Sequence, residues 1–481
     1  MTDNKPLLSA VEKYRQQHVY PLHTPGHKGG RGADKELRHL VGDVALESDV
    51  SLMAELDDLH HPSGCIQETE KLAAHLYGSD RCFLGVNGTT GLIHSMLLGA
   101  LRPGDKIILP RNCHRSVLGG LILGGLVPVY LQPPYDDTWH MVLQITPGQV
   151  EKAFNEHPDS KAVFLTTPDY FGLAADTKKI AEITHRHDAV LLVDEAHGPH
   201  LGFSKKLPPS AMASGADAAA QSTHKLLGAM TQCSLLQVNY KRLRPEAMEA
   251  AASLMATTSP NYLLLGSLDG ARAQLAAYGK MMAEASIQAA QQLRDALHTI
   301  SELPVLEQEL IGKGGVVAMD PGKVTIRVSA LGVTGPEAAD ALRQEGVAVE
   351  LVDEEHVLFL VTYADVNPEF PAAIETIVKT LQKIRKPGHK ILPAAPVTQL
   401  PERVLLPREA FFAPHHPVAF LEAAGKIAGE SISFYPPGIP VVMPGEKITA
   451  ELLSYCETMR KRGLVVSGPK DPLLRHIEVI A

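Results

Sequence analysis

Short apolar segments alternate with helical or turn-rich segments from about residue 60 to residue 300 of the chain. The apolar segments that we expect to form buried strands are residues 81–86, 105–110, 127–132, 161–167 and 189–194. Strands that are apolar on both faces need cover on both faces, which helices between parallel strands supply. The pattern therefore predicts an α/β fold with a mainly parallel sheet.

The pattern changes toward both ends of the chain. A long amphipathic helix is expected over 277–300, and a proline-rich linker over 384–404 interrupts regular structure. We expect four parts along the chain: an N-terminal arm (1–60), a large domain (61–305), a small α+β domain (306–390) and a C-terminal domain (391–481).

Composition and charge narrow the class of protein. The 481 residues are 45 % hydrophobic and 21 % charged, with 45 Lys and Arg against 54 Asp and Glu, a net charge of −9. This balance is typical of a folded domain and argues against a binder of nucleic acid or of an anionic membrane. The start of the chain is too charged for a signal peptide, and the longest apolar run (116–134) is broken by glycines and Pro128. We expect a soluble, cytoplasmic protein.

The sequence gives little evidence for a metal site or for a disulfide framework. The five cysteines include no CxxC pair, which argues against a disulfide framework and a Cys-rich zinc site. His23 and His27 are four residues apart, but they lie in a Gly/Pro loop and have no zincin glutamate nearby. We therefore expect no catalytic metal.

A phosphate-binding turn is predicted where the first strand ends. The segment NGTTG (87–91) lies between a strand and a helix, where backbone N–H groups and hydroxyls can bind an anion. It is not a Walker A loop, because no Gly-Lys-Ser/Thr follows. The alternative is an ordinary turn in which a threonine caps the helix.

Two further segments carry ionisable side chains. Asp194 ends the strand AVLLVD, at the edge where parallel sheets bind ligands, although it could instead cap the next helix. The letters DEAH at this point also resemble a helicase box, but a Walker A partner and a basic path are missing. Lys225 precedes an apolar stretch and could be a Schiff-base nucleophile, or a solvated surface lysine.

Taken together, the turn, the acid and the lysine match the needs of pyridoxal 5′-phosphate. The turn suits its phosphate, Lys225 its aldehyde, and Asp194 its pyridine nitrogen, which must stay protonated to withdraw electrons. A flat side chain over the ring is also expected, and His114 follows another predicted strand.

At this point the sequence resembles a known family, the bacterial ornithine/lysine/arginine decarboxylases. The motifs that carry the resemblance occur in the family's order: HTPGHKGG, SDVS, NGTTG, RNCHRS, VDEAHG, STHKLLGAMTQ, TTSPNYLLLGSLD and YPPGIPVVMPGE. The resemblance implies that the protein is a pyridoxal phosphate enzyme of fold type I. Its large domain is then expected to be aspartate-aminotransferase-like, with a mainly parallel sheet of the seven-stranded type, and to be followed by smaller α+β C-terminal domains. Because HTPGHKGG begins at residue 23, the chain resembles the short form, without an N-terminal wing domain.

The resemblance also assigns roles to single residues. It implies Lys225 as the Schiff-base lysine, Asp194 as the partner of the pyridine nitrogen, His114 as the stacking residue and His197 as a neighbour of the cofactor. The residues implied to hold the phosphate are Gly88, Thr89, Thr90, Ser222 and His224.

Two implied contacts lie farther along the chain. Thr258 and Ser259 resemble a segment that reaches the active site of a neighbouring subunit, so a homodimer is expected as the minimal active unit. Glu446 is a carboxylate that could face the distal cation of the substrate, with a helix-initiating or structural role as the alternative.

The expected reaction is decarboxylation of a basic L-amino acid. The family resemblance favours arginine, giving agmatine for polyamine biosynthesis, before lysine, giving cadaverine, and ornithine, giving putrescine. An aminotransferase on the same fold is the main alternative, with Arg327 as the residue that would bind the substrate carboxylate. A non-enzymatic protein of this fold, or a nucleotide-binding protein, is a further alternative. The presence of the turn, of Asp194 and of Lys225 together argues against it.

Overall fold

The computed structural model describes residues 4–53, 55–391, 400–435, 439–462 and 464–481. The chain divides into two compact units. The first unit comprises residues 1–100, 192–203 and 209–280, and the second comprises 101–191, 204–208 and 281–481. Part of the proline-rich linker (392–399) and the PPG of the YPPG motif (436–438) lie outside the described residues. The division into four domains stays a prediction.

The large sheet has seven strands in the order β1-β10-β9-β8-β6-β2-β3. Their bounds are β1 (Arg81–Gly85), β10 (Ser234–Val238), β9 (Ala218–Gln221), β8 (Val190–Asp194), β6 (Ser160–Thr166), β2 (Lys106–Pro110) and β3 (Val127–Leu131). β2 runs parallel to β3 and β6, and β8 runs parallel to β9. The predicted α/β class with a mainly parallel sheet is confirmed.

One strand of the sheet runs against the others in the first unit. β10 is antiparallel to both of its neighbours, β1 and β9. Consequently β1 and β9 run in the same direction, which is also the direction of β8. The carboxyl ends of β1, β8 and β9 therefore lie at one edge of the sheet, where open α/β sheets bind ligands.

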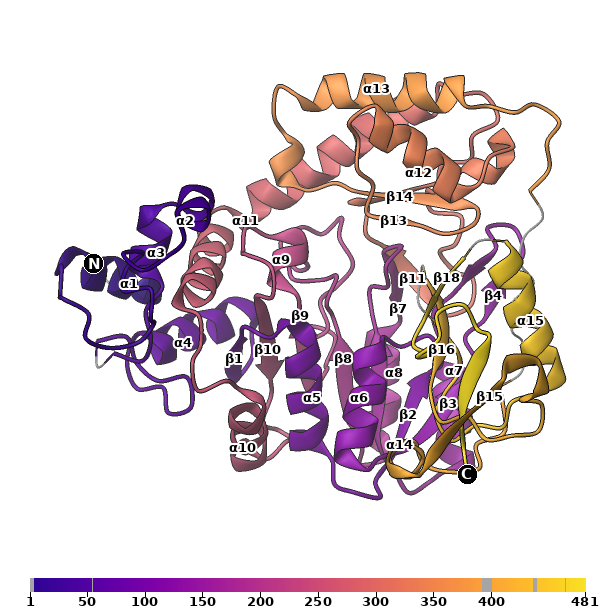
Figure 1. Cartoon of the computed structure of the whole chain (residues 1–481), viewed down its shortest axis with the longest axis horizontal. Coiled ribbons are helices and arrows are strands. Elements are labelled where there is room, and N and C mark those ends of the chain that lie inside the picture. The colour runs from indigo at the N-terminus through magenta and orange to yellow at the C-terminus, as the bar shows by residue number, and fades with distance from the viewer. Residues whose placement is uncertain (1–3, 54, 392–399, 436–438, 463) are drawn as a thin grey trace. The chain divides into compact units, whose positions relative to one another are not determined.

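The helices of the first unit are α1 (Pro6–Gln16), α2 (Lys35–Val41), α3 (Asp43–Ser48), α4 (Cys65–Tyr77), α5 (Gly88–Ala100), α9 (Thr223–Leu226) and α10 (Pro245–Met255). α4 and α5 contact strand β1. Ile66 of α4 and Leu84 of β1 belong to one buried apolar cluster. Gly78 caps the C-terminus of α4 with a φ of +70°, which glycine adopts readily. Figure 1 shows α5 and α10 side by side.

The predicted amphipathic helix is longer than the pattern indicated. α11 (Tyr262–Leu297) begins before the expected residue 277, continues past residue 280 and ends at Leu297. Its start is buried, because Tyr262 and Leu265 are fully covered within the core of the first unit.

The small α+β domain lies in the second unit. Its sheet has the order β12 (Lys323–Arg327), β14 (His356–Leu360), β13 (Leu351–Val352), and helices α12 (Gly335–Gln344) and α13 (Phe370–Lys383) lie on one side of β13 and β14 (Figure 1). Thr334 and Glu337 form a capping box that fixes the start of α12. β13 is short, because only Leu351 and Val352 pair with β14.

The C-terminal region, which begins at residue 400, has an apolar core of its own. Its elements are α14 (Pro407–Phe412), β15 (His415–Ala419), β16 (Ile432–Tyr435), β17 (Ile439–Val442), α15 (Ala450–Lys461), β18 (Val465–Ser467) and β19 (His476–Ile480). β15 pairs with β19, and β16 pairs with both β17 and β18, in antiparallel ladders.

Short elements complete the second unit. They are α6 (Arg115–Gly124), β4 (Tyr135–Asp136), β5 (Met141–Val142), α7 (Pro147–Glu156), β7 (Leu173–Ala175), α8 (Thr177–Arg186), β11 (Val316–Met319) and the 3-10 turns η1 (Val328–Leu331), η2 (Tyr363–Asp365) and η3 (Phe420–Glu422). Among all described residues, no helix is both long and apolar enough to cross a membrane.

Candidate active site

The carboxyl end of β8 carries Asp194, which is buried at the edge of the sheet where the carboxyl ends of β1, β8 and β9 lie. The side chain is 3 % exposed, and its Oδ1 accepts a hydrogen bond from the Ala196 N–H at 3.0 Å. The turn after β1 and the segment after β9 emerge at the same edge. The fold thus brings the predicted acid to the same sheet edge as the predicted turn and lysine segment.

The turn between β1 and α5 leaves room for an anion. Gly88 has a φ of +64°, and a Cβ at this position would meet no atom within 4 Å. Its own N–H donates to Gln232 O at 2.9 Å, so Gly88 offers open space rather than a hydrogen-bond donor. The N–H groups of Thr89 and Thr90 follow in the first turn of α5, where a helix has no acceptors of its own for them.

A hydroxyl pair joins this turn to the segment that follows β9. Thr89 and Ser222 lie 133 residues apart in the chain, yet their hydroxyl oxygens are hydrogen-bonded to each other. Both residues are buried, at 7 % and 2 % exposure. The structure therefore brings together two of the residues predicted to hold a phosphate.

Lys225 lies on the single helical turn α9, between β9 and β10. Its Nζ is 3.1 Å from Nε2 of His197, which is 3 % exposed and follows β8. An amine and an imidazole at this distance can exchange a proton. The neighbouring His224 uses its Nδ1–H to donate to Cys233 O at 2.9 Å, which leaves Nε2 as the outer ring nitrogen.

A second buried carboxyl follows Asp194, and the sequence reasoning gave it no role. Glu195 is 1 % exposed and accepts hydrogen bonds from the Ala211 N–H at 2.6 Å and from Gln221 Nε2 at 2.8 Å. Burial raises the pKa of Glu195 to about 7, in spite of these two donors. Gln221 immediately precedes Ser222, so Glu195 supports the segment that carries Lys225.

Replacing Glu195 by glutamine is expected to change how stability depends on pH. Because the folded-state pKa is raised, the carboxyl stabilises the fold fully below about pH 4.5, its ordinary value, and loses this contribution as pH rises through about 7. Wild-type protein should therefore lose on the order of 2 to 3 kcal/mol more than Glu195→Gln between pH 4.5 and 8. Urea unfolding at these pH values measures the difference, with the exposed Glu182→Gln as control. Parallel losses in both proteins would contradict the assignment.

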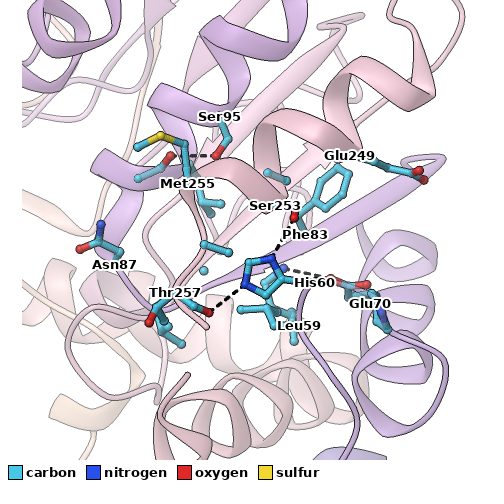
Figure 2. A pocket seen from close by; sticks show the side chains of 18 of the residues that line it. Leu59, His60, Glu70, Phe83, Asn87, Ser95, Glu249, Ser253, Met255 and Thr257 are labelled. Carbon is cyan, nitrogen blue, oxygen red and sulfur yellow. Dashed lines mark hydrogen bonds between the residues drawn. The ribbon is translucent and has the colours of Figure 1, made fainter. Parts of the chain in front are cut away.

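A cavity of about 530 Å³ lies beside the turn between β1 and α5, within the first unit (Figure 2). α5 turns the face that carries Gly88, Gly91 and Ser95 toward this cavity, whereas Thr89 points to Ser222. His60 at its wall is held by Ser253 Oγ at 2.8 Å and by Thr257 O at 3.2 Å. The cavity therefore borders the turn on the face away from the hydroxyl pair.

Comparison with known families agrees with this arrangement. The model "Orn/Lys/Arg decarboxylase, major domain" matches residues 5–368, and "Orn/Lys/Arg decarboxylase, C-terminal domain" matches residues 392–466. The chain belongs to the Orn/Lys/Arg decarboxylase family. Enzymes of this family depend on pyridoxal 5′-phosphate. The family predicted from the motifs is thereby confirmed.

Individual relatives of the decarboxylase family extend the comparison. An arginine decarboxylase of Bacillus anthracis is 39 % identical over 481 residues, which cover 99 % of this chain and 97 % of the relative. The Francisella novicida lysine decarboxylase has a TM-score of 0.86 at 22 % identity, over 99 % of this chain and 81 % of that chain.

The predicted aspartate-aminotransferase-like fold is also confirmed. An aspartate aminotransferase from Thermus thermophilus has a TM-score of 0.50 at 13 % identity, over 66 % of this chain and 90 % of that chain. At this identity the likeness concerns the fold alone.

Three further predicted site residues of this decarboxylase-family chain, His114, Thr258 and Ser259, are exposed. His114 belongs to the second unit, where it is exposed and caps the N-terminus of α6. Thr258 and Ser259 are exposed in the first unit, and the Ser259 N–H donates to Thr257 Oγ1 at 3.1 Å. Within the described residues, no group of three His, Cys, Asp or Glu side chains is arranged to hold a metal ion.

Glu446 has a partner within the chain. Its two carboxylate oxygens accept hydrogen bonds from Arg111 Nη1 at 2.5 Å and Nη2 at 2.7 Å, and Oε2 also accepts from the Met443 N–H at 2.8 Å. The side chain is 1 % exposed. This geometry favours the structural alternative for Glu446 over contact with a substrate cation.

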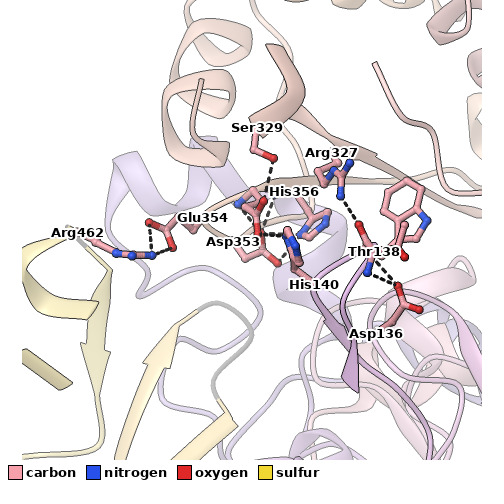
Figure 3. Close-up of polar contacts among 11 residues, drawn as sticks. Asp136, Thr138, His140, Arg327, Ser329, Asp353, Glu354, His356 and Arg462 are labelled. Carbon is pink, nitrogen blue, oxygen red and sulfur yellow. Dashed lines mark hydrogen bonds and ion pairs between the residues drawn. The ribbon is translucent and has the colours of Figure 1, made fainter. Parts of the chain in front are cut away.

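Arg327, the residue on which the aminotransferase alternative depended, is also engaged (Figure 3). Its Nη1 donates to Thr138 O, and its guanidinium lies 5.7 Å from the centre of the Trp139 ring. Asp136 fixes the same turn by accepting from the Thr138 and Trp139 N–H groups. These contacts give Arg327 a structural role on the small domain.

Proposed function

We propose that the protein is an arginine decarboxylase, which converts L-arginine into agmatine and CO₂. The observation that carries the proposal is the 39 % identity, over 99 % of the chain, to an arginine decarboxylase. The lysine decarboxylase of similar fold is 22 % identical. A cytoplasmic place in polyamine biosynthesis is part of the proposal, because agmatine is a precursor amine.

The residues of the first unit fit pyridoxal phosphate by their chemistry. Gly88 provides open space that a Cβ would fill, and the hydroxyls of Thr89 and Ser222 lie together beside the start of α5. Thr223 Oγ1 is buried and, among the described residues, has no hydrogen-bond partner. A phosphate needs several donors of this kind, and a helix N-terminus adds a favourable dipole.

When bound, pyridoxal phosphate supplies a protonated pyridine ring that withdraws electrons from the bond to be broken. Thr89, Thr90, Ser222 and His224 would hold its phosphate. The carboxylate of Asp194 would hold a proton on the ring nitrogen, and its burial strengthens this charge interaction.

Lys225 and His197 are the groups placed to move a proton. The amine of Lys225 would hold the cofactor through its aldehyde carbon. Once CO₂ has left, Cα needs a proton in its place, and Nζ of Lys225 is the proposed donor. His197 Nε2, at 3.1 Å from Nζ, can return that proton to the amine.

A competition experiment tests the proposed substrate. Purified protein loaded with pyridoxal phosphate is incubated with equal amounts of arginine, lysine, ornithine and the other common amino acids, and the products are measured by mass spectrometry. We expect arginine to disappear and agmatine to appear. Formation of cadaverine or putrescine without agmatine would show that lysine or ornithine is the substrate. A keto acid formed when an acceptor is added would overturn decarboxylation.

A shared active site is expected if the homodimer is the active unit. Thr258 and Ser259 are exposed, as a segment that reaches a second subunit must be. Lys225→Ala and Ser259→Ala proteins, each with low activity, should regain part of the wild-type turnover when mixed, because hybrid dimers contain one intact site. Subunit exchange is verified by native mass spectrometry. If the subunits exchange but turnover does not recover, the shared active site is contradicted.

A further inference from the structure

Helix α6 carries His114 at its N-terminus and fixes the orientation of the ring. His114 Nδ1 accepts a hydrogen bond from the Ser116 N–H at 3.2 Å and lies 2.8 Å from Ser116 Oγ. Because a backbone N–H can only donate, Nδ1 is the acceptor and the neutral ring carries its proton on Nε2. Any movement of the first turn of α6 therefore moves this ring.

The segment before His114 is bound to the C-terminal region by Arg111. This guanidinium is 4 % exposed and forms the bidentate pair with Glu446. It also donates to Pro440 O at 3.1 Å and Val441 O at 3.3 Å. It lies 5.0 Å from the centre of the Tyr130 ring. A planar guanidinium bound on several sides in this way has one orientation.

The other end of α6 is bound to the same region. Arg408, at the start of α14, donates through Nη1 to Ile122 O at 3.2 Å and Leu123 O at 2.7 Å. These carbonyls belong to the last turn of α6, where a cation is also favoured by the helix dipole. Arg403 of the C-terminal region donates to Pro128 O, at the start of the next strand.

We propose that the C-terminal region positions His114, by holding α6 at both of its ends. Arg111 and Glu446 hold the approach to the N-terminus, and Arg408 holds the C-terminus. The inference rests on the proposed decarboxylase function, for which the family resemblance implies His114 as the residue that would stack on the cofactor ring. The proposal also accounts for the motif PGE (444–446). Its glutamate, Glu446, binds Arg111 of the motif RNCHRS, three residues before His114.

The central test removes the buried pair without leaving a charge behind. Replacing both partners, as Arg111→Met with Glu446→Leu, substitutes apolar side chains of similar length, a change that buried ion pairs often tolerate. We expect the unfolding midpoint to stay near the wild-type value while kcat for arginine falls by roughly 10- to 100-fold, with a smaller change in KM. A wild-type kcat in the folded double variant would overturn the proposal.

A double-mutant cycle with His114→Ala separates positioning from a general loss of stability. If the pair acts through His114, the triple variant loses no more kcat than His114→Ala alone, so the effects are not additive. Multiplying losses would overturn the proposal. Arg294→Met is the control, because Arg294 is a buried arginine that donates to Pro321 O and Lys323 O in the small domain. Its folded fraction should keep the wild-type kcat.

A measurement without turnover keeps this inference apart from the proposed function. Amide hydrogen exchange of residues 115–124 should accelerate in the double variant prepared without cofactor, and unchanged exchange would overturn the holding role. If the double variant does not fold, Arg408→Met tests the exposed end: faster exchange in the last turn of α6 and a several-fold lower kcat are expected, and wild-type values would overturn the proposal. If wild-type protein instead leaves arginine intact, the proposed function fails, while the exchange result still decides the holding role.

Discussion

Lys225→Ala is expected to lose arginine turnover by at least about 10³- to 10⁴-fold, the scale on which removal of a catalytic group acts. The amine lies at hydrogen-bond distance from His197, and alanine supplies neither a nucleophile nor a proton. Borohydride reduction of the cofactor-loaded wild-type protein should attach the cofactor to the peptide that contains Lys225. The same treatment should leave the variant unlabelled.

The matched control for this result is Lys280→Ala, since Lys280 is an exposed lysine of α11. It should keep both turnover and labelling. Labelling of the Lys225→Ala protein at another lysine, or turnover close to wild type, would show that a different amine does the chemistry.

Asp194→Asn is expected to preserve the fold and cofactor binding but to lower turnover by roughly 10²- to 10⁴-fold. Asparagine retains an oxygen for the Ala196 N–H, so local packing is kept. It removes the negative charge that would hold a proton on the pyridine nitrogen, and the ring then withdraws electrons less strongly. Equilibrium dialysis of the cofactor and steady-state kinetics measure the two effects separately.

Glu195→Gln is the control for Asp194→Asn, because it makes the same change at the next residue. Glu195 is as deeply buried, but it binds Ala211 and Gln221. Its turnover should stay near the wild-type value. If both variants lost turnover equally, the loss would come from replacing any buried acid at this strand end and not from removing the charge of Asp194.

Much of the sheet could be predicted from the sequence, because buried parallel strands are continuous apolar runs. The strands expected at 81–86 and 189–194 agree with the structure to within one residue. β9 was missed, since its residues Ala-Ala-Ala-Gln favour helix in isolation and become a strand by pairing with β8 and β10. Short strands of this kind are decided by their neighbours.

The place of Asp194 in the fold was predictable from the sequence, because Asp194 ends a predicted strand and the carboxyl ends of parallel strands meet at one edge. The partners of Arg111 and Glu446 were not predictable, since these residues lie 335 positions apart and no local pattern links them. The same holds for the contact between Thr89 and Ser222.

The pairing of β1 with the distant strand β10 also affects the order in which the sheet forms during synthesis on the ribosome. β1 pairs with β10, which leaves the ribosome about 150 residues later. At roughly 5–20 residues per second, β1 therefore stays unpaired on this edge for about 8 to 30 seconds. Residues 101–191 are synthesised during this interval, and they belong to the other compact unit. The turn at Gly88 and the lysine at 225 therefore come together late in synthesis, when unpaired β1 is open to binding by chaperones.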